Sequence, residues 1–201
     1  MTPRPNVSDE RKSQIVSAAI EVFTEKGFDE ARMDDIAEKT GLSKGTLYLY
    51  FDNKNELIMA ILDRIFQREF RQLESLIREG TNTVDVLRDF TQLMSREIGA
   101  LLRLIPVIYQ FLALAFRNHY VQHALQLYLN QYLDFLIPII QRGIDSGELR
   151  AVDPREVAIA MGAIIEGTVL LWVYDRDAIN PERHIQSGIN LLLEGIMVRG
   201  S

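Results

Sequence analysis

The stretch ARMDDIAEKTGLSKGTLYLYFDNKNEL, residues 31–57, contains two short helix patterns separated by a turn. Apolar residues at helical spacing predict the first helix over residues 33–40. Gly41 follows directly and ends it, because glycine is the residue that most readily closes a helix. Ser43 is a good cap for a second helix over residues 44–50. The stretch therefore predicts two short helices joined by a tight turn.

Amphipathic helices flank this stretch on both sides. Apolar residues recur at helical spacing over residues 15–23, which predicts a helix over residues 8–26. On the other side, Asn53 and Glu56 form a start typical of a capping box, and apolar spacing continues over residues 54–79. At 1.5 Å per residue that last helix is a rod of about 39 Å. A long helix followed by two short ones is the arrangement of a helix-turn-helix.

The outward surface of the helix over residues 44–50 indicates a binding function. Leu47 and Phe51 are four residues apart and can both face the core. The side chains left to project outward are Lys44, Thr46, Tyr48, Leu49 and Tyr50. Tyrosine and leucine side chains on a solvated helix are unfavourable without a partner. The alternative is a structural three-helix subdomain with a solvated charged face.

The remainder of the chain also has helical patterns. They run over residues of about 83–104, 105–118 and 119–146. Pro154 and Pro181 each follow a cap residue and begin two more helices. Pro138 lies inside the third of these patterns and should kink or divide it. Because no strand, hairpin or repeat pattern is visible, the fold class is predicted to be all-α with about nine helices.

Composition restricts the function classes. The 201 residues are 47% hydrophobic and 25% charged, as in ordinary globular proteins. The absence of cysteine excludes disulfides, thiolate zinc sites and a cysteine nucleophile. The net charge of −6 argues against a nucleic-acid partner, and residues 1–54 carry eight basic groups against ten acidic ones. A DNA-binding function must therefore rest on local placement of charge. No signal peptide or membrane span is expected, since charges or prolines interrupt the apolar stretches, and a cytoplasmic protein is predicted.

Residues 10–60 resemble the signature of the TetR family of transcriptional regulators. The matching residues are Phe28, Asp34-Asp35-Ile36-Ala37, Gly41-Leu42-Ser43-Lys44-Gly45-Thr46-Leu47-Tyr48, Tyr50-Phe51, Lys54 and Leu57. The rest of the chain is similar to the family in length, helix order and the pattern of Glu166-Gly167 and Trp172. The resemblance implies a helix-turn-helix DNA-binding domain over residues 8–53. It also implies a ligand-binding and dimerisation domain over residues 54–199, with the helix 54–79 connecting the two.

The resemblance further implies which residues contact a double-stranded, palindromic DNA operator. They are Arg32, Lys44, Gly45, Thr46, Tyr48, Leu49, Tyr50 and Lys54. The chemistry agrees, because lysine donates to guanine, threonine and leucine contact thymine methyl groups, and tyrosine and lysine hold phosphates. This chain departs from the family at Ala31-Arg32, where a small hydroxyl residue is common. Asp34 and Asp35 can compensate for the weaker cap through the helix dipole.

A regulator of this type is expected to be a repressor that a small apolar or amphipathic effector releases from DNA. Aromatic, apolar and polar side chains predicted to line an effector cavity are Phe90, Met94, Glu97, Leu101, Tyr109, Phe116, His123, Leu127, Gln131 and Trp172. The alternative is ordinary core packing, which for any single one of these residues is the commoner role of an apolar stripe at helical spacing.

The last two predicted helices supply the hypothesis of a homodimer. Small residues that permit close helix approach and an apolar stripe give the candidate interface, which is Gly162, Ala163, Glu166, Ile185, Ile189, Leu192, Leu193 and Ile196. Packing within one protomer could use the same face. The family resemblance, in which these helices pair across a two-fold axis, favours dimerisation.

No catalytic, metal or cofactor site is predicted. His119 and His123 have i, i+4 spacing, but no third ligand is near them in the sequence. A phosphate-binding loop and a dinucleotide fingerprint are absent. An enzyme, or a helical interaction module without DNA binding, remains the alternative to the DNA-binding regulator.

Overall fold

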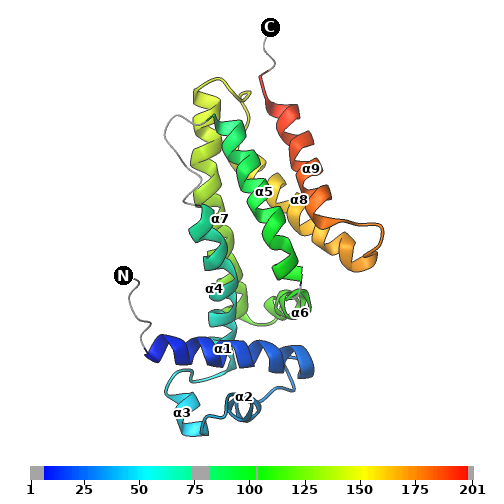
Figure 1. Ribbon diagram of the computed structural model, residues 1–201. Helices are drawn as coiled ribbons and strands as arrows, with labels where there is room; N and C mark the ends of the chain where they lie inside the picture. Colours follow the sequence, from blue (N-terminus) through cyan, green and yellow to red (C-terminus); the bar gives the residue numbers. More distant parts are fainter. Residues whose placement is uncertain (1–6, 74–81, 103, 199–201) are drawn as a thin grey trace. The chain divides into compact units, whose positions relative to one another are not determined.

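The computed structural model describes residues 7–73, 82–102 and 104–198, and within these ranges the chain forms nine α-helices and no strand (Figure 1). The helices are α1 (Val7–Lys26), α2 (Met33–Thr40), α3 (Lys44–Tyr48), α4 (Lys54–Leu73), α5 (Thr83–Leu102), α6 (Ile105–Ala115), α7 (His119–Asp145), α8 (Pro154–Tyr174) and α9 (Pro181–Ile196). The all-α prediction is confirmed. The chain divides into two compact units, residues 1–66 with 104–126 and residues 67–103 with 127–201.

The first unit, called here the N-terminal unit, contains the helix-turn-helix and α6. Within it α1 packs on α2 and α6, and α2 packs on α3. Phe23 of α1 lies at the centre, with ring centroids 5.4 Å from Phe28 and 6.2 Å from Phe111 of α6. Packing thus joins residues 104–126 to the helix-turn-helix region α1–α3, which is called here the head. The predicted boundary between a DNA-binding and a ligand-binding domain at residue 54 stays a prediction.

Two glycines shape the head by adopting a backbone conformation that other residues avoid. Gly27 ends α1 with φ of 76°, and Gly41 ends α2 with φ of 69°. The Gly41 and Leu42 N–H groups donate to carbonyls in the last turn of α2, at 3.1 Å each. This compact stop turns the chain at once toward α3. The predicted bounds of the helix that Gly41 ends, residues 33–40, are confirmed.

The second unit, called here the C-terminal unit, is built around α9. This helix packs against α5 and α8, and Figure 1 shows the three side by side. Ile185, Ile189 and Leu193 of α9 are fully buried, as is Leu87 of α5. A polar contact holds the start of α5 in place, since the Thr83 N–H donates to the Glu148 carboxylate at 2.6 Å.

Three sequence predictions about helix limits need adjustment. Pro138 neither divides nor ends α7, which is assigned as one helix from His119 to Asp145. Helix α3 ends at Tyr48 rather than at residue 50, because the Tyr50 and Phe51 N–H groups both donate to Leu47 O in a closing turn. The long helix from Lys54 is described to Leu73, and its predicted continuation to residue 79 lies outside the described residues.

Substitution of Gly143 by alanine is expected to destabilise the C-terminal unit. The added Cβ would lie 2.7 Å from Thr83 Cγ2 and 2.9 Å from Leu149 Cδ1, so both neighbours must shift. The free energy of unfolding should fall by about 1–3 kcal/mol in urea denaturation. Gly99→Ala is the control, because among the described residues nothing lies within 4 Å of its Cβ position, and it should be neutral or stabilising. Equal stability of the two variants would contradict the packing at Gly143.

Candidate nucleic-acid interface

Helix α3 is held by one buried side chain and one cap. Leu47 has no exposed surface, and Phe51 just beyond the helix is 7% exposed, so both predictions of an inward face are confirmed. Ser43 Oγ accepts from the Thr46 N–H at 3.1 Å and lies 2.8 Å from the Thr46 hydroxyl. The cap and the buried leucine fix the orientation of a helix too short to be stable alone.

The opposite face of α3 and its C-terminal turn is exposed. Leu49 is 83% exposed and Tyr48 is 40% exposed. Lys44 and Gly45 are also exposed, while Thr46 and Tyr50 are half-buried. The predicted DNA-contacting residues of this segment therefore lie on or near one solvated surface.

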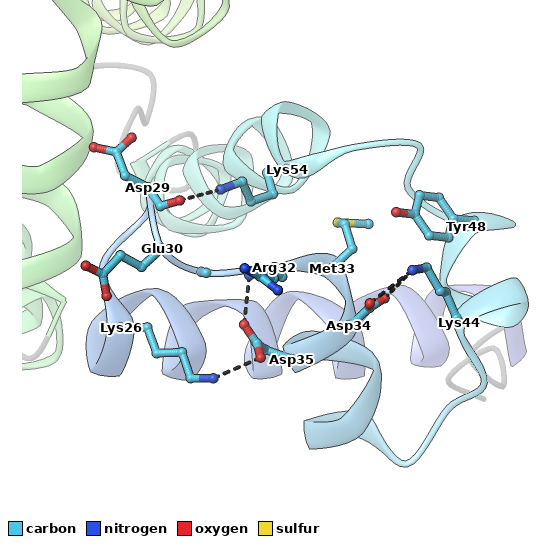
Figure 2. Close-up of a pocket in the computed structure, with 11 residues that line it drawn as sticks. Lys26, Asp29, Glu30, Arg32, Met33, Asp34, Asp35, Lys44, Tyr48 and Lys54 are labelled. Carbon is cyan, nitrogen blue, oxygen red and sulfur yellow. Dashed lines mark hydrogen bonds and ion pairs between the residues drawn. The ribbon is translucent and has the colours of Figure 1, made fainter.

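A groove of about 970 Å³ borders this surface (Figure 2). Its lining carries four cationic and four acidic side chains, namely Lys26, Arg32, Lys44, Lys54, Asp29, Glu30, Asp34 and Asp35. Two ion pairs form here. The Lys26 Nζ lies 2.8 Å from Asp35 Oδ1, and the Lys44 Nζ lies 2.7 Å from Asp34 Oδ1. The formal charges of the groove cancel.

Asp35 performs the capping role expected at the start of α2. Its carboxylate accepts a hydrogen bond of 2.8 Å from the backbone N–H of Arg32, the residue before the helix. The hydrogen bond from Lys26, followed by that from the Arg32 backbone, lowers the pKa of Asp35. The compensation predicted for Ala31-Arg32 thus includes a direct hydrogen bond as well as the dipole effect.

Lys54 makes contacts that the sequence did not predict. Its Nζ donates to Phe28 O at 2.6 Å and to Asp29 O at 3.3 Å, and it lies 4.5 Å from the centroid of the Phe28 ring. Burial lowers the pKa of this ammonium. The side chain ties the start of α4 to the turn between α1 and α2. The predicted phosphate contact would have to use the remaining N–H donor.

The turn after α6 is joined to the same region of the N-terminal unit. Arg117 Nη2 lies 2.6 Å from Asp29 Oδ2, and the Asn118 side-chain amide donates to Asn55 Oδ1 at 2.9 Å. These partners are separated by 88 and 63 residues. No local pattern could have paired them.

The predicted effector-contacting residues do not share one environment. Phe90 is 1% exposed and packs on Tyr132 and Phe135, with ring centroids 6.4 and 6.0 Å away, which is core packing. Phe116 is 95% exposed and Leu127 is 45% exposed.

The other predicted effector contacts are equally scattered. His123 and Gln131 are exposed, Met94, Tyr109 and Trp172 are half-buried, and the side chains of Glu97 and Leu101 lie outside the described residues. Two cavities are lined by residues of the N-terminal unit, and none of the predicted effector contacts borders either of them. The effector cavity therefore stays a prediction.

The predicted dimer stripe on α9 is largely used inside the protomer. Ile185, Ile189 and Leu193 have no exposed surface and Ile196 has 7%, because α5 and α8 cover them. Leu192 is half-buried. The four buried side chains are unavailable to a partner, which corrects their predicted role. Periodicity identified a buried face but not the element that covers it.

The predicted interface residues on α8 are divided between packing and exposure. A Cβ at Gly162 would lie 3.4 Å from the ring of Tyr132, whose hydroxyl donates to Ala158 O at 2.8 Å. Gly162 thus admits a buried tyrosine within the protomer. Ala163 is exposed. Glu166 is exposed as a residue, although burial of its carboxyl group raises its pKa.

Six large apolar side chains are exposed on α8 and α9. They are Ile159, Leu170, Leu171, Val173, Tyr174 and Leu191, and together we call them the α8–α9 apolar face. Because of it, α8 is long and apolar enough to cross a membrane by length and composition, with a mean hydropathy of 1.9 and only 28% of that window buried. A single helix that passes this test does not indicate membrane insertion. An exposed apolar face of this extent is also what a partner helix requires.

Substitution of Lys54 by methionine is expected to destabilise the N-terminal unit. It removes the hydrogen bonds to the Phe28 and Asp29 carbonyls and the contact with the Phe28 ring. The loss should be about 1–3 kcal/mol in urea denaturation, and Lys54→Arg should recover part of it. If Lys54→Met is as stable as the wild type but binds DNA more weakly, the Lys54 side chain acts only on phosphate.

Comparison with known families matches both parts of the chain. Residues 15–61 match the family described as bacterial regulatory proteins, tetR family. Residues 86–194 match the family described as BetI-type transcriptional repressor, C-terminal. The two matches together include the helix-turn-helix and the helices from α5 to α9.

Individual relatives agree with these matches. The HTH-type transcriptional activator FasR of Mycolicibacterium smegmatis is 31% identical over 193 residues, covering 94% of this chain and 84% of that protein. The fatty acid metabolism regulator protein of Bacillus subtilis is 27% identical over 186 residues, covering 91% and 94%. SmeT, a repressor from Stenotrophomonas maltophilia, has been solved in complex with triclosan and shares the fold of this chain. The TM-score is 0.82 at 22% sequence identity, and the match covers 95% of this chain and 93% of the SmeT chain. The chain therefore belongs to the TetR family of DNA-binding transcriptional regulators.

Proposed function

We propose that this regulator is a homodimeric repressor that reads a palindromic operator through α3 and is released by an apolar or amphipathic effector. The observation that carries the proposal is the two-sided character of α3. Leu47 fixes its inner face, and Tyr48 and Leu49 remain exposed beside Lys44. A base edge in the major groove is a partner for all three, because it offers acceptors and thymine methyl groups. This function places the protein in the cytoplasm.

The proposed contacts divide into base reading and phosphate holding. Lys44, Thr46, Tyr48 and Leu49 are assigned to base edges, with Gly45 leaving room for close approach, since among the described residues nothing lies within 4 Å of its Cβ position. Arg32, Tyr50 and Lys54 are assigned to phosphates. Because the groove charges cancel, affinity rests on these local contacts rather than on a basic surface.

Repression is supported by the match of residues 86–194 to a repressor family. The relative FasR is an activator by name, so the sign of regulation is part of the proposal. An apolar effector is consistent with triclosan in the structure of SmeT and with the name of the fatty acid metabolism regulator. Neither name assigns a ligand to this chain.

The packing of the N-terminal unit supports a route for release. Because Phe111 of α6 contacts Phe23 of α1, a displacement of α6 would be transmitted to the head. The continuous helix α4 gives a second route, since it begins at Lys54 beside the α1–α2 turn. An effector that prefers the displaced arrangement would shift the population away from the DNA-binding form.

The homodimer is proposed to form through the α8–α9 apolar face. Leu171 is 50% exposed and Leu191 is 67% exposed, and such side chains gain from burial against a second copy. Ala163 and Glu166 lie on α8, as Leu171 does, and keep their proposed place in the interface. The original stripe contributes by holding α9 in position rather than by touching the partner.

The double substitution Lys44→Ala with Tyr48→Ala is expected to abolish specific operator binding. It removes a cation and an aromatic group from the exposed face, and Leu47 still anchors the helix. Anisotropy titration with operator selected by the wild-type protein, at matched salt, checks this. Binding as tight as wild type would contradict the assignment of α3 as the reading helix.

The double substitution Leu171→Glu with Leu191→Glu is expected to give folded monomers, because a dimer would bury two unpaired charges from each copy. Sedimentation velocity and circular dichroism measure mass and helix content. Tyr120→Glu is the matched control, since Tyr120 is 67% exposed on α7, belongs to the N-terminal unit and is not one of the residues of this face, and it should leave the dimer intact. A dimer that survives the double substitution would move the interface elsewhere.

An effector should bind the operator-bound protein more weakly than the free protein. Triclosan and a long-chain fatty acid are the first probes, and a coupling factor of about 5–150 is typical. Linkage requires that saturating operator weaken effector binding by the same factor that the effector weakens operator binding. Calorimetry with and without operator measures it, and equal affinities in the two titrations would contradict the release mechanism.

A further inference from the structure

The lysine expected to read bases is already paired with a carboxylate. Lys44 Nζ lies 2.7 Å from Asp34 Oδ1 and 3.0 Å from Asp34 Oδ2 (Figure 2). Both side chains are about 60% exposed, at 60% and 59%. Asp34 comes from the first turn of α2 and Lys44 from the start of α3, so the pair joins the two helices of the motif.

The surroundings leave this pair directed at solvent. The neighbouring acid Asp35 is bonded to Lys26 and to the Arg32 backbone, and Lys54 is bonded to backbone carbonyls. Tyr48 and Arg32 line the same groove. The hydrogen bond that Lys44 donates to Asp34 raises the pKa of Lys44, so the lysine is fully charged at neutral pH. The result is a fixed donor beside a fixed acceptor, about 3 Å apart.

A guanine–cytosine pair presents the complementary arrangement in the major groove. Guanine offers the N7 and O6 acceptors, and cytosine offers the N4 amino donor. O6 and N4 are themselves hydrogen-bonded in the base pair, so they lie about 2.9–3.0 Å apart. That spacing matches the separation of the Lys44 and Asp34 atoms. A lysine donating to guanine would therefore bring the carboxylate close to the free N–H of cytosine N4.

We propose that Asp34 and Lys44 act as one specificity-determining unit that reads a single G·C pair in each half-site. Lys44 donates to guanine N7 and O6, and Asp34 accepts from cytosine N4. The inference rests on the proposed entry of α3 into the major groove. It adds an α2 residue to the reading surface and assigns the base pair that this surface selects.

An adenine–thymine pair fits this unit less well. Adenine N6 could donate to Asp34, but each acceptor beside it, adenine N7 or thymine O4, stands alone. Lys44 would lose the adjacent double acceptor of guanine. The ion pair also makes the acid tolerable near DNA, because Lys44 neutralises a carboxylate that the phosphates would otherwise repel.

Selection of bound sequences from a random DNA library tests the inference. The proteins are wild type, Asp34→Asn, Lys44→Met, the double variant and Asp29→Asn. Asp29 borders the same groove but pairs with Arg117, so its variant is the matched control. Wild type should prefer G·C over A·T by about 5- to 150-fold at one position per half-site. Asp34→Asn and Lys44→Met should each lose preference at that same position, the double variant should lose little more, and Asp29→Asn should keep it.

Three results would overturn the inference. If Asp34→Asn binds all DNA sequences more tightly and keeps the wild-type preference for G·C, Asp34 only repels the phosphates and does not read a base. Loss of preference at different positions in Asp34→Asn and Lys44→Met would separate the two residues. A preference for A·T at the shared position would contradict the base assignment. Failure of wild type to select any sequence would instead refute the proposed function, and the inference with it. Unchanged thermal unfolding of Asp34→Asn shows that the fold is intact.

Discussion

The burial of Leu47 is the contact on which the proposed DNA-binding surface depends. Helix α3 has five residues and cannot hold its shape through its own hydrogen bonds. Leu47 and the adjacent Phe51 fill the core of the head, and the Ser43 cap fixes the first turn. Because these contacts leave no rotational freedom, Lys44, Tyr48 and Leu49 must face outward. The ion pair with Asp34 then depends on the same fixed orientation.

Polar contacts set the position of the head within the N-terminal unit. The Lys54 ammonium bonds to two backbone carbonyls, and Arg117 and Asn118 bond to Asp29 and Asn55. Among these contacts, the exposed Arg117–Asp29 ion pair contributes little to stability. The contacts are directional, however, so they favour one arrangement of α4, α6 and the α1–α2 turn over others. A contact that is weak but geometrically specific suits a regulator that must change between two arrangements.

Local sequence signals predicted the helices of this chain well, because caps and stops act over a few residues. Ser43, Gly41 and the Asn180-Pro181 step each mark a helix end that the structure contains. The exposed face of α3 was also predictable, since its inward and outward residues follow helical spacing. What periodicity cannot supply is the partner of an apolar face. Ile189 and Leu193 were predicted as part of an apolar stripe at a dimer interface, but helix α5, about 90 residues earlier in the sequence, packs against α9, and both side chains are buried. The Arg117–Asp29 pair was invisible for the same reason.

The acidic character of the chain bears directly on how it discriminates among DNA sequences. Sequence-independent affinity comes from cations that displace counterions from phosphates. In this head Lys26, Lys39 and Lys44 are paired with carboxylates, which reduces their attraction for any phosphate backbone. Specific binding loses less, because hydrogen bonds to base edges depend on position rather than on total charge. Neutralising the lysines internally therefore widens the ratio between specific and non-specific affinity, and that ratio decides whether a regulator finds its operator among the other sites of a genome.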